Sequence, residues 1–288
     1  MSWLLLAFLA LAPGAAEAQS GASRFGAAAM DAEVDGLEME IYAYRPEACA
    51  SPSVLVVFHG NGRGAESYRN SAQRVADQSC FVIYSPLFDE ERYPSWKYHR
   101  GGLVRDGETL DPETWTVEQV GELVDWIRAR EGRDVPIYLF GHSAGGQFLS
   151  RYAAYMEPND VARIVIANPS TYVLPNFDES IPYGFEGLPP EFDAERLIDH
   201  YLAAPVTIYL GTDDTGQKDL TMTRQAVRQG DNRLDRGRKT FELARAEAER
   251  RGVPFGWELV EAEGVGHTAR GMLEHRDILE ALGFDLAS

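Results

Sequence analysis

Residues 141–146, with the sequence Gly-His-Ser-Ala-Gly-Gly, constrain the fold of this chain more than any other segment because of what flanks them. Residues 135–140 are apolar and rich in β-branched and aromatic side chains, which predicts a buried strand. Residues 147–156 carry apolar side chains at helical spacing and stop before Pro158. A G-x-S-x-G turn between strand and helix holds its serine above the sheet, so Ser143 is a candidate nucleophile. The alternative is a glycine-rich turn that only packs closely.

A second predicted strand also ends in a glycine-rich turn. Residues 54–58 form a continuous apolar run, which predicts a buried strand leading into the sequence His-Gly-Asn-Gly at 59–62. In chains with a serine elbow, this turn supplies one backbone N–H of an oxyanion hole, and the residue after the nucleophile supplies the other. We therefore predict Asn61 and Ala144 as the two donors. The alternative is an ordinary strand–helix turn whose glycines serve packing alone.

A third predicted strand, at residues 206–210, ends in a turn that carries two neighbouring carboxylates. An acid at such a position can orient a histidine and stabilise the imidazolium that it becomes. We favour Asp214, which lies three residues after Gly211. Asp213 stays open as the alternative, and whichever of the two is not used is expected to cap the next segment or to face water.

The candidate base is His267, which lies between glycines in residues 264–268, beyond a late strand at 257–260. A histidine in such a turn is free to reach over the edge of the sheet. Two other histidines belong to the turns described above. The remaining three are expected to be solvated, in a loop or in polar helices: His99, His200 and His275.

The candidates follow one another in the order Ser143, Asp214 and His267, which is typical of α/β-hydrolases. Over about residues 32–285, the chain resembles the α/β-hydrolase superfamily. It is most similar there to secreted esterases of the polyhydroxybutyrate-depolymerase and feruloyl-esterase type. The resemblance rests on three turn sequences, at residues 58–62, 141–146 and 211–215.

The resemblance implies an α/β-hydrolase fold, with a mainly parallel, doubly wound sheet, and a serine carboxylesterase that acts through an acyl-enzyme. It implies no cofactor and no metal, and the expected partner is a small-molecule or polymeric ester. Asn61 interrupts the His-Gly-Gly-Gly sequence of lipases, so the properties of that subgroup are not carried over. A serine peptidase or an acyltransferase is the alternative. A non-catalytic binding protein is less favoured, because all three candidate residues are present.

The charge balance limits the partners further. The chain of 288 residues has 45 acidic against 27 Lys and Arg side chains and a formal net charge of −18. Nucleic acids and anionic membrane surfaces reward positive patches, so neither is an expected partner. The oligomeric state is not predicted by any of these features.

Strands and helices alternate along the chain, which predicts a mainly parallel sheet with helices on both faces. Residues 32–44 alternate polar and apolar side chains around Gly36 and predict an opening antiparallel hairpin. Helices are expected at residues 67–78, 117–130, 148–156, 238–251 and 271–282.

Three stretches fall outside this alternation. Residues 86–115 and 168–204 are long and rich in aromatic side chains, and we expect the first to form a cleft wall and the second a small cap insertion. Their aromatics would suit an apolar or aromatic ester, unless they bury themselves as the core of the cap. Residues 229–238 are expected to form a solvated loop, with recognition of a substrate carboxylate as the alternative.

The first 18 residues are predicted to be a signal peptide. An apolar run at residues 3–12 is broken by Pro13 and followed by an Ala-Glu-Ala sequence at 16–18, before Gln19. The run is too short to span a bilayer, and no stable membrane anchor is expected. We therefore predict an α/β-hydrolase domain over residues 19–288, exported to the periplasm or the exterior.

The two cysteines agree with export. Cys49 and Cys80 each precede a predicted strand, and the superfamily resemblance implies that these strands are parallel neighbours. A disulfide between them would stabilise the fold by about 3.5 kcal/mol on the loop-entropy model. Two buried free thiols are the alternative. Neither cysteine has a partner at the spacing of a zinc site.

Overall fold

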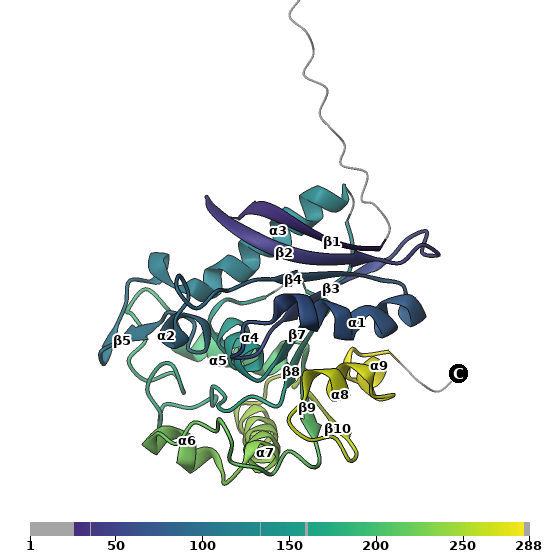
Figure 1. Cartoon of the computed structure of the whole chain (residues 1–288). Helices are drawn as coiled ribbons and strands as arrows, with labels where there is room; N and C mark the ends of the chain where they lie inside the picture. The colour runs from purple at the N-terminus through teal and green to yellow at the C-terminus, as the bar shows by residue number, and fades with distance from the viewer. Residues whose placement is uncertain (1–25, 35, 133, 159–160, 285–288) are drawn as a thin grey trace, which may run out of the picture.

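The computed structural model describes residues 26–34, 36–132, 134–158 and 161–284 (Figure 1). The predicted signal peptide lies outside these residues. Within them, no helix combines the length and the apolar character that crossing a membrane requires.

An eight-stranded sheet runs through the described part of the chain in the order β1-β2-β4-β3-β7-β8-β9-β10. From β4 to β10 every neighbouring pair is parallel, whereas β1 pairs antiparallel with β2, and β2 antiparallel with β4. The predicted α/β-hydrolase sheet is thus confirmed. The strands are β1 Gly26–Val34, β2 Leu37–Arg45, β3 Ser53–Phe58, β4 Phe81–Pro86, β7 Ile137–His142, β8 Arg163–Ala167, β9 Val206–Gly211 and β10 Glu258–Ala262. A separate antiparallel pair consists of β5 Val104–Arg105 and β6 Glu108–Thr109.

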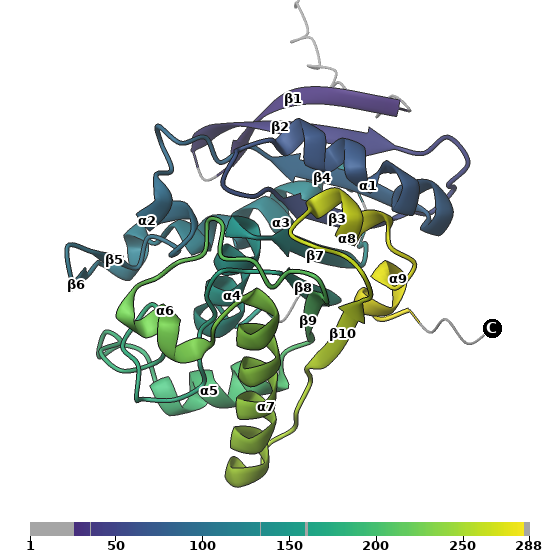
Figure 2. The ribbon, with the colours of Figure 1, turned by 60° about the horizontal axis from the view of Figure 1, so that its bottom comes forward.

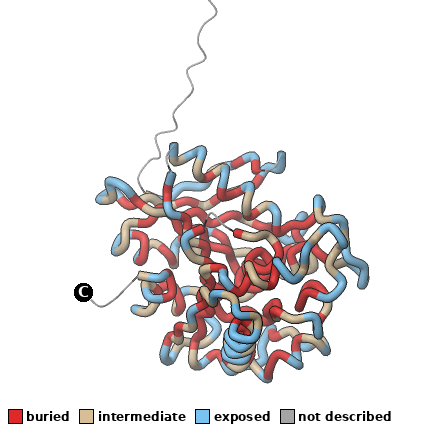
Figure 3. Tube along the Cα trace, turned by 180° about the vertical axis from the view of Figure 1, so that it is seen from behind, coloured by how far each residue is buried: buried red, intermediate tan, exposed pale blue. Residues whose placement is uncertain are grey.

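Helices cover both faces of this sheet, because alternate residues of each strand point to opposite sides. In β3, Val54 and Val56 belong to one apolar core, whereas Leu55 and Val57 belong to the other. The first core packs against α3 Gln119–Glu131, α4 Ala144–Tyr155, α5 Ala194–Ala203 and α7 Arg233–Arg251. The second packs against α1 Ala65–Ser79, α8 Ala269–Glu274 and α9 Ile278–Ala281. Figure 2 shows α1 and α8 side by side, and Figure 3 shows the buried central strands.

Four short helical segments connect these elements: α2 Ser95–Tyr98, η1 Pro112–Thr114, η2 Thr116–Glu118 and α6 Arg224–Gln229.

Several expected element bounds are corrected. The hairpin is longer than predicted, since β1 begins at Gly26. The closing helix expected at residues 271–282 is two short helices, α8 and α9, because the chain leaves the helical conformation at His275, which is extended.

The largest correction concerns residues 229–238, which are not a solvated loop. The helix α7 begins at Arg233, five residues before the expected start, because the side chain of Asn232 accepts a hydrogen bond from the backbone N–H of Asp235 and caps the helix. Gln229, Arg233 and Arg236 are buried. The side chains of Arg233 and Arg236 therefore point into the protein, whereas that of Arg238 is exposed.

A disulfide joins Cys49 to Cys80, whose Cα atoms are 5.4 Å apart. The two residues precede β3 and β4, which are parallel neighbours as the superfamily resemblance implied. The backbone N–H of Ser53 also donates to the carbonyl oxygen of Cys80 at 3.1 Å. The bond therefore ties together the amino-terminal ends of two central strands, at the opposite edge of the sheet from Ser143.

Replacing both cysteines, in a Cys49→Ala/Cys80→Ala variant, should lower the free energy of unfolding by about 3.5 kcal/mol, because the unfolded chain regains the entropy of the closed loop. Urea denaturation of the variant and of the oxidised wild type measures the difference. Wild type unfolded in reductant is the control and should match the variant. Two reactive thiols in the native, unreduced protein would contradict the expectation.

Candidate active site

Ser143 stands at the junction of β7 and α4 with a backbone conformation that few residues adopt. Its φ is 58° and its ψ is −112°, and it serves as the N-cap of α4. A positive φ is uncommon for a residue with a Cβ and is concentrated at functional sites, where the surrounding fold holds it. Its backbone N–H donates to the carbonyl oxygen of Ala167, at the end of β8, at 2.9 Å. The turn is thereby fixed to the next strand.

The glycines around Ser143 are required by space. A Cβ on Gly141 would lie 2.4 Å from the carbonyl oxygen of Gly145, and a Cβ on Gly145 would lie 2.3 Å from the carbonyl oxygen of Phe58. A Cβ on Gly146 would come within 2.9 Å of the carbonyl oxygen of Gly141. The Gly-x-Ser-x-Gly-Gly sequence therefore lets α4 start directly against β3 and β7.

His267 lies within hydrogen-bond distance of both Ser143 and Asp214, although the three residues are far apart in the sequence. The Nε2 atom of His267 is 3.0 Å from the Oγ of Ser143. Its Nδ1 atom is 2.7 Å from an Oδ of Asp214. Asp214 is 2% exposed, whereas Asp213 is exposed to solvent. Of the two carboxylates that the sequence left open, only Asp214 lies against the histidine.

The loop that carries His267 is held at the ends of β9 and β10. The backbone N–H of Asp213 donates to the carbonyl oxygen of Val265 at 3.0 Å. Gly211 makes this approach possible, since a Cβ there would lie 2.3 Å from the same oxygen. Asp214 and His267 are thus brought together because Gly211, at the end of β9, has no side chain.

Asn61 and Ala144, the expected oxyanion donors, both lie near the serine. Asn61 lines the same cavity as Ser143 and His267. Ala144 is the first residue of α4, where a backbone N–H has no acceptor within the helix. The N–H of Ala144 can therefore donate to a group outside the helix.

His59 fixes the turn that carries Asn61. Its ring is fully buried, and burial lowers its pKa to about 4, so the ring is neutral near pH 7. Its Nε2 accepts a hydrogen bond from the N–H of Phe88 at 3.1 Å, which leaves Nδ1–H to donate to the carbonyl oxygen of Gly60 at 2.9 Å. The hydroxyl of Tyr98 donates to the carbonyl oxygen of His59 at 2.8 Å. His59 therefore holds this backbone and carries no proton to the reaction.

Arg233, which the sequence patterns did not identify as a site residue, lies beside Asp214. Its Nη1 is 3.5 Å from an Oδ of Asp214, and both side chains are 1% exposed. Its Nη2 donates to the carbonyl oxygen of Lys218 at 2.9 Å. Burial lowers the pKa of the Arg233 guanidinium, and the Asp214 charge opposes that shift. The sequence signal was the Asn232-to-Asp235 capping pattern, which starts a helix and turns Arg233 inward.

Tyr68, on α1, is a second residue that was not predicted, and it lines the same cavity as Ser143. Burial raises the pKa of its phenol to about 12. The phenol oxygen is 3.0 Å from the Nδ1 of His142. His142 is buried, its pKa is held well below the usual range by burial, and its ring centroid is 4.8 Å from that of His267. No pattern in the sequence distinguishes Tyr68 from an ordinary helix residue.

The cavity at the site has a volume of about 500 Å³, and its wall combines polar side chains with apolar surface. Hydroxyl side chains come from α1, an acidic side chain from Asp219, and a guanidinium from Arg270. Besides Ser143 and His267, the lining residues include Asn61, Ser67, Tyr68, Ser71, Asp219, Thr268 and Arg270.

Aromatic residues of the two long segments do not line this cavity. Tyr172, Tyr183 and Phe185 are buried, and Trp115 stacks on Phe192 with ring centroids 5.2 Å apart. The two segments pack on each other through these rings, so most of their aromatics serve as core, whereas Phe177 is exposed. The expectation that His99 is solvated is also wrong, because its ring is largely buried and burial lowers its pKa to about 4.

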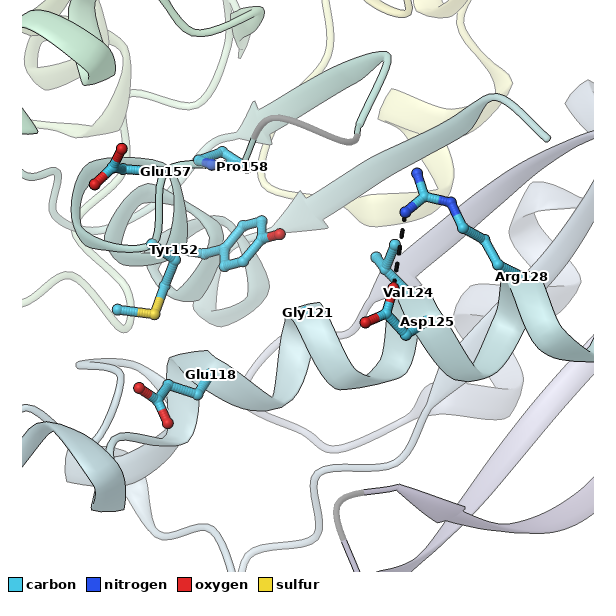
Figure 4. Close-up of a pocket in the computed structure, with 9 residues that line it drawn as sticks. Glu118, Gly121, Val124, Asp125, Arg128, Tyr152, Glu157 and Pro158 are labelled. Atoms are coloured by element: carbon cyan, nitrogen blue, oxygen red, sulfur yellow. Dashed lines mark ion pairs between the residues drawn. The ribbon is translucent and has the colours of Figure 1, made fainter. Parts of the chain in front are cut away.

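A second hollow, of about 280 Å³, lies between α3 and the carboxyl end of α4 (Figure 4). Tyr152 reaches into it from α4, and Asp125 and Arg128 line it from α3. It contains none of the residues expected at the site.

Residues 53–225 match the α/β hydrolase fold family. The poly(3-hydroxybutyrate) depolymerase LpqC from Bordetella parapertussis is 32% identical, with a TM-score of 0.82, over 92% of this chain and 93% of that one. The poly(aspartic acid) hydrolase-1 from Sphingomonas sp. KT-1 is 30% identical, with a TM-score of 0.80, over 86% of this chain and 96% of that one. No curated protein matches the sequence.

A more distant structure shares the fold alone. The S-formylglutathione hydrolase FrmB from Staphylococcus aureus is 15% identical, with a TM-score of 0.54, over 91% of this chain and 98% of that one. The chain belongs to the α/β hydrolase fold family, as its turn sequences predicted. It is a hydrolase of that superfamily, similar to a polyhydroxybutyrate depolymerase.

Two arginines of α7 allow a test of the buried ion pair. Arg233→Met should lower the free energy of unfolding by about 3 to 5 kcal/mol, because it leaves the buried Asp214 carboxylate without a compensating charge. Arg238→Met, five residues along the same helix, removes an exposed pair with Glu261 and should cost less than about 1 kcal/mol. Urea denaturation measures both. Equal losses of unfolding free energy in the two variants would show that the buried pair stabilises the fold no more than the exposed one.

Proposed function

We propose that this protein is an exported serine esterase that cleaves carboxylic esters through Ser143, His267 and Asp214. The observation that carries the proposal is that His267 reaches both partners at once, with Nε2 at 3.0 Å from the Ser143 Oγ and Nδ1 at 2.7 Å from Asp214. A serine hydroxyl is a weak nucleophile unless a base takes its proton. Here His267 is the base, and Asp214 is the acid that orients it.

The proposed reaction begins at His267. Because the Asp214 carboxylate accepts the hydrogen bond from Nδ1–H, the lone pair of Nε2 faces the hydroxyl of Ser143. The Oγ attacks the ester carbonyl while its proton moves to Nε2. The imidazolium that results is stabilised by Asp214, whose charge Arg233 partly balances.

The oxyanion of the tetrahedral intermediate is proposed to lie between the N–H groups of Asn61 and Ala144. Each such donor contributes roughly 3 kcal/mol to the lowering of the barrier. The alcohol leaves with the proton of His267, and water then attacks the acyl-enzyme by the same route in reverse. No cofactor is part of the proposed reaction.

A hydroxy-acid ester, either small or polymeric, is the proposed substrate. The similarity to a poly(3-hydroxybutyrate) depolymerase supports it, and so does a cavity wall of hydroxyl groups and Arg270, which can bind the polar ends of such a chain. Hydrolysis of an amide polymer is the second candidate. It is favoured by the similarity to a poly(aspartic acid) hydrolase.

Export is part of the proposal. It rests on the apolar segment at residues 3–12, on the Ala-Glu-Ala sequence that follows, and on the disulfide between Cys49 and Cys80. Disulfides persist mainly in oxidising compartments.

A fluorophosphonate should form a single covalent adduct on the wild-type protein and none on Ser143→Ala, because only an activated serine attacks phosphorus. The turnover number of Ser143→Ala on an ester should fall about a million-fold. Intact-mass spectrometry and ester assays measure these results. Ser71→Ala, which changes a hydroxyl on the wall of the same cavity, should be labelled like wild type. An adduct that survives in Ser143→Ala would reject the proposal.

The substrate class is tested with soluble oligomers of 3-hydroxybutyrate and of aspartic acid, at equal concentrations of the linkage. We expect kcat/KM to be at least about 100-fold higher for the ester oligomer, a difference of about 2.7 kcal/mol. Mass spectrometry of the products reports which bond is cleaved. A preference for the aspartate oligomer would favour the amide candidate, and Ser143 labelling would still define the nucleophile.

A further inference from the structure

The phenol of Tyr68 lies close to the candidate nucleophile, Ser143. A Cβ on Gly60 would lie 2.6 Å from the phenol oxygen of Tyr68 and 3.6 Å from the Cβ of Ser143. The absence of a side chain at position 60 therefore lets the phenol approach the serine. Both residues line one cavity, together with Asn61.

The neighbouring His142 decides which way the phenol proton points. Burial holds the pKa of His142 well below its usual range, so the ring is neutral and has one N–H and one bare nitrogen. In the part of the chain that the structure describes, its buried Nε2 has no hydrogen-bond partner. A buried N–H without an acceptor is rarer and costlier than a bare lone pair. The proton is therefore on Nδ1, which donates to the phenol oxygen of Tyr68 at 3.0 Å.

The backbone of Gly60 lies against the same oxygen, and it acts to lower the pKa of the Tyr68 phenol, against the larger effect of burial. The oxygen of Tyr68 accepts the hydrogen bond from His142. The phenol proton is therefore not used in the contact with His142 and is free to point into the cavity.

We propose that the hydroxyl of Tyr68 is a third hydrogen-bond donor to the oxyanion, beside the N–H groups of Asn61 and Ala144. This inference rests on the proposed serine mechanism. Burial raises the pKa of the phenol to about 12, so its proton is present throughout the neutral range. The hydrogen bond that the oxygen accepts from His142 polarises the O–H group and makes it a stronger donor.

The step in which Tyr68 acts is the formation of the tetrahedral intermediate. The bond from the Ser143 Oγ to the carbonyl carbon forms, and the Oγ proton goes to the Nε2 of His267. The π-electron pair of the carbonyl moves to its oxygen, which accepts the hydrogen bond from Tyr68. When the intermediate collapses, this pair re-forms the carbonyl, the bond to the leaving oxygen breaks, and the proton of His267 goes to the leaving group. The phenol keeps its own proton in both directions.

The test compares Tyr68→Phe with Tyr44→Phe, which removes a surface hydroxyl that donates to Asp77, far from the cavity. A donor to the oxyanion acts on the transition state and not on the bound ester. In Tyr68→Phe we expect kcat to fall about 100-fold, with KM changed less than about twofold. The Ki of a trifluoromethyl ketone, which forms an oxyanion adduct with the serine, should rise by a similar factor. Tyr44→Phe should match wild type in all three.

Other results would overturn the assignment. If Tyr68 instead donates to His142, Tyr68→Phe will lower the melting temperature but leave kcat and the Ki of the ketone within about twofold of wild type. Values in that range would mean that no contact with the transition state has been lost. A rise in KM alone would make Tyr68 a residue that only binds the ester.

A second variant covers the case in which Tyr68→Phe does not fold. Incorporation of 3-fluorotyrosine at position 68 keeps the ring and the hydroxyl but makes the phenol more acidic. A donor to the oxyanion becomes stronger, so the Ki of the ketone should fall, whereas an unchanged Ki would contradict the proposal. Fluorophosphonate labelling of Ser143 separates the two hypotheses: labelling with an unaffected Ki rejects the role of Tyr68 alone, and no labelling of Ser143 rejects the serine mechanism.

Discussion

The structure depends on the close approach of α4 to the ends of β3 and β7. The carbonyl oxygen of Phe58 lies where a Cβ of Gly145 would be, and Gly141 and Gly145 touch through their backbones in the same way. This contact starts α4 immediately after Ser143 and holds that residue at a φ of 58°. The cost of the unusual conformation is offset by the packing of the helix and by the hydrogen bond from Ser143 to β8. Any larger side chain at these glycines would move the serine.

Burial determines which of the titratable side chains around that serine are neutral and which are charged. His59 and His142 are buried, burial lowers the pKa of each, and both are therefore neutral near pH 7. Asp214 is buried as well, but it keeps a partner on each side, Arg233 and His267. A buried carboxylate with a cation beside it can stay ionised, and a buried histidine without an anion cannot. Among the site histidines, His267 is the one whose side chain both reaches solvent and faces an acid.

Strong local patterns explain which features were predictable. Turn sequences between apolar strands gave the fold and the chain order of Ser143, Asp214 and His267, because such turns depend on a few adjacent residues. The start of α7 was missed, since its cap at Asn232 lay within a stretch whose charges suggested solvent. Tyr68 was not predicted because its position in α1 matters only through Gly60, in the turn after β3, and His142, at the end of β7.

The sequence by itself determined the strand–turn–helix units, the family and the set of side chains offered at each strand end. These follow from residue spacing and from the need for glycine at tight turns, which are local properties. Only the tertiary structure decided that Asp214 and not Asp213 lies against His267, and that Arg233 stands behind it. It also decided that Tyr68 borders the serine. Those outcomes depend on distances between segments far apart in the chain, which only the packing of helices against the sheet fixes.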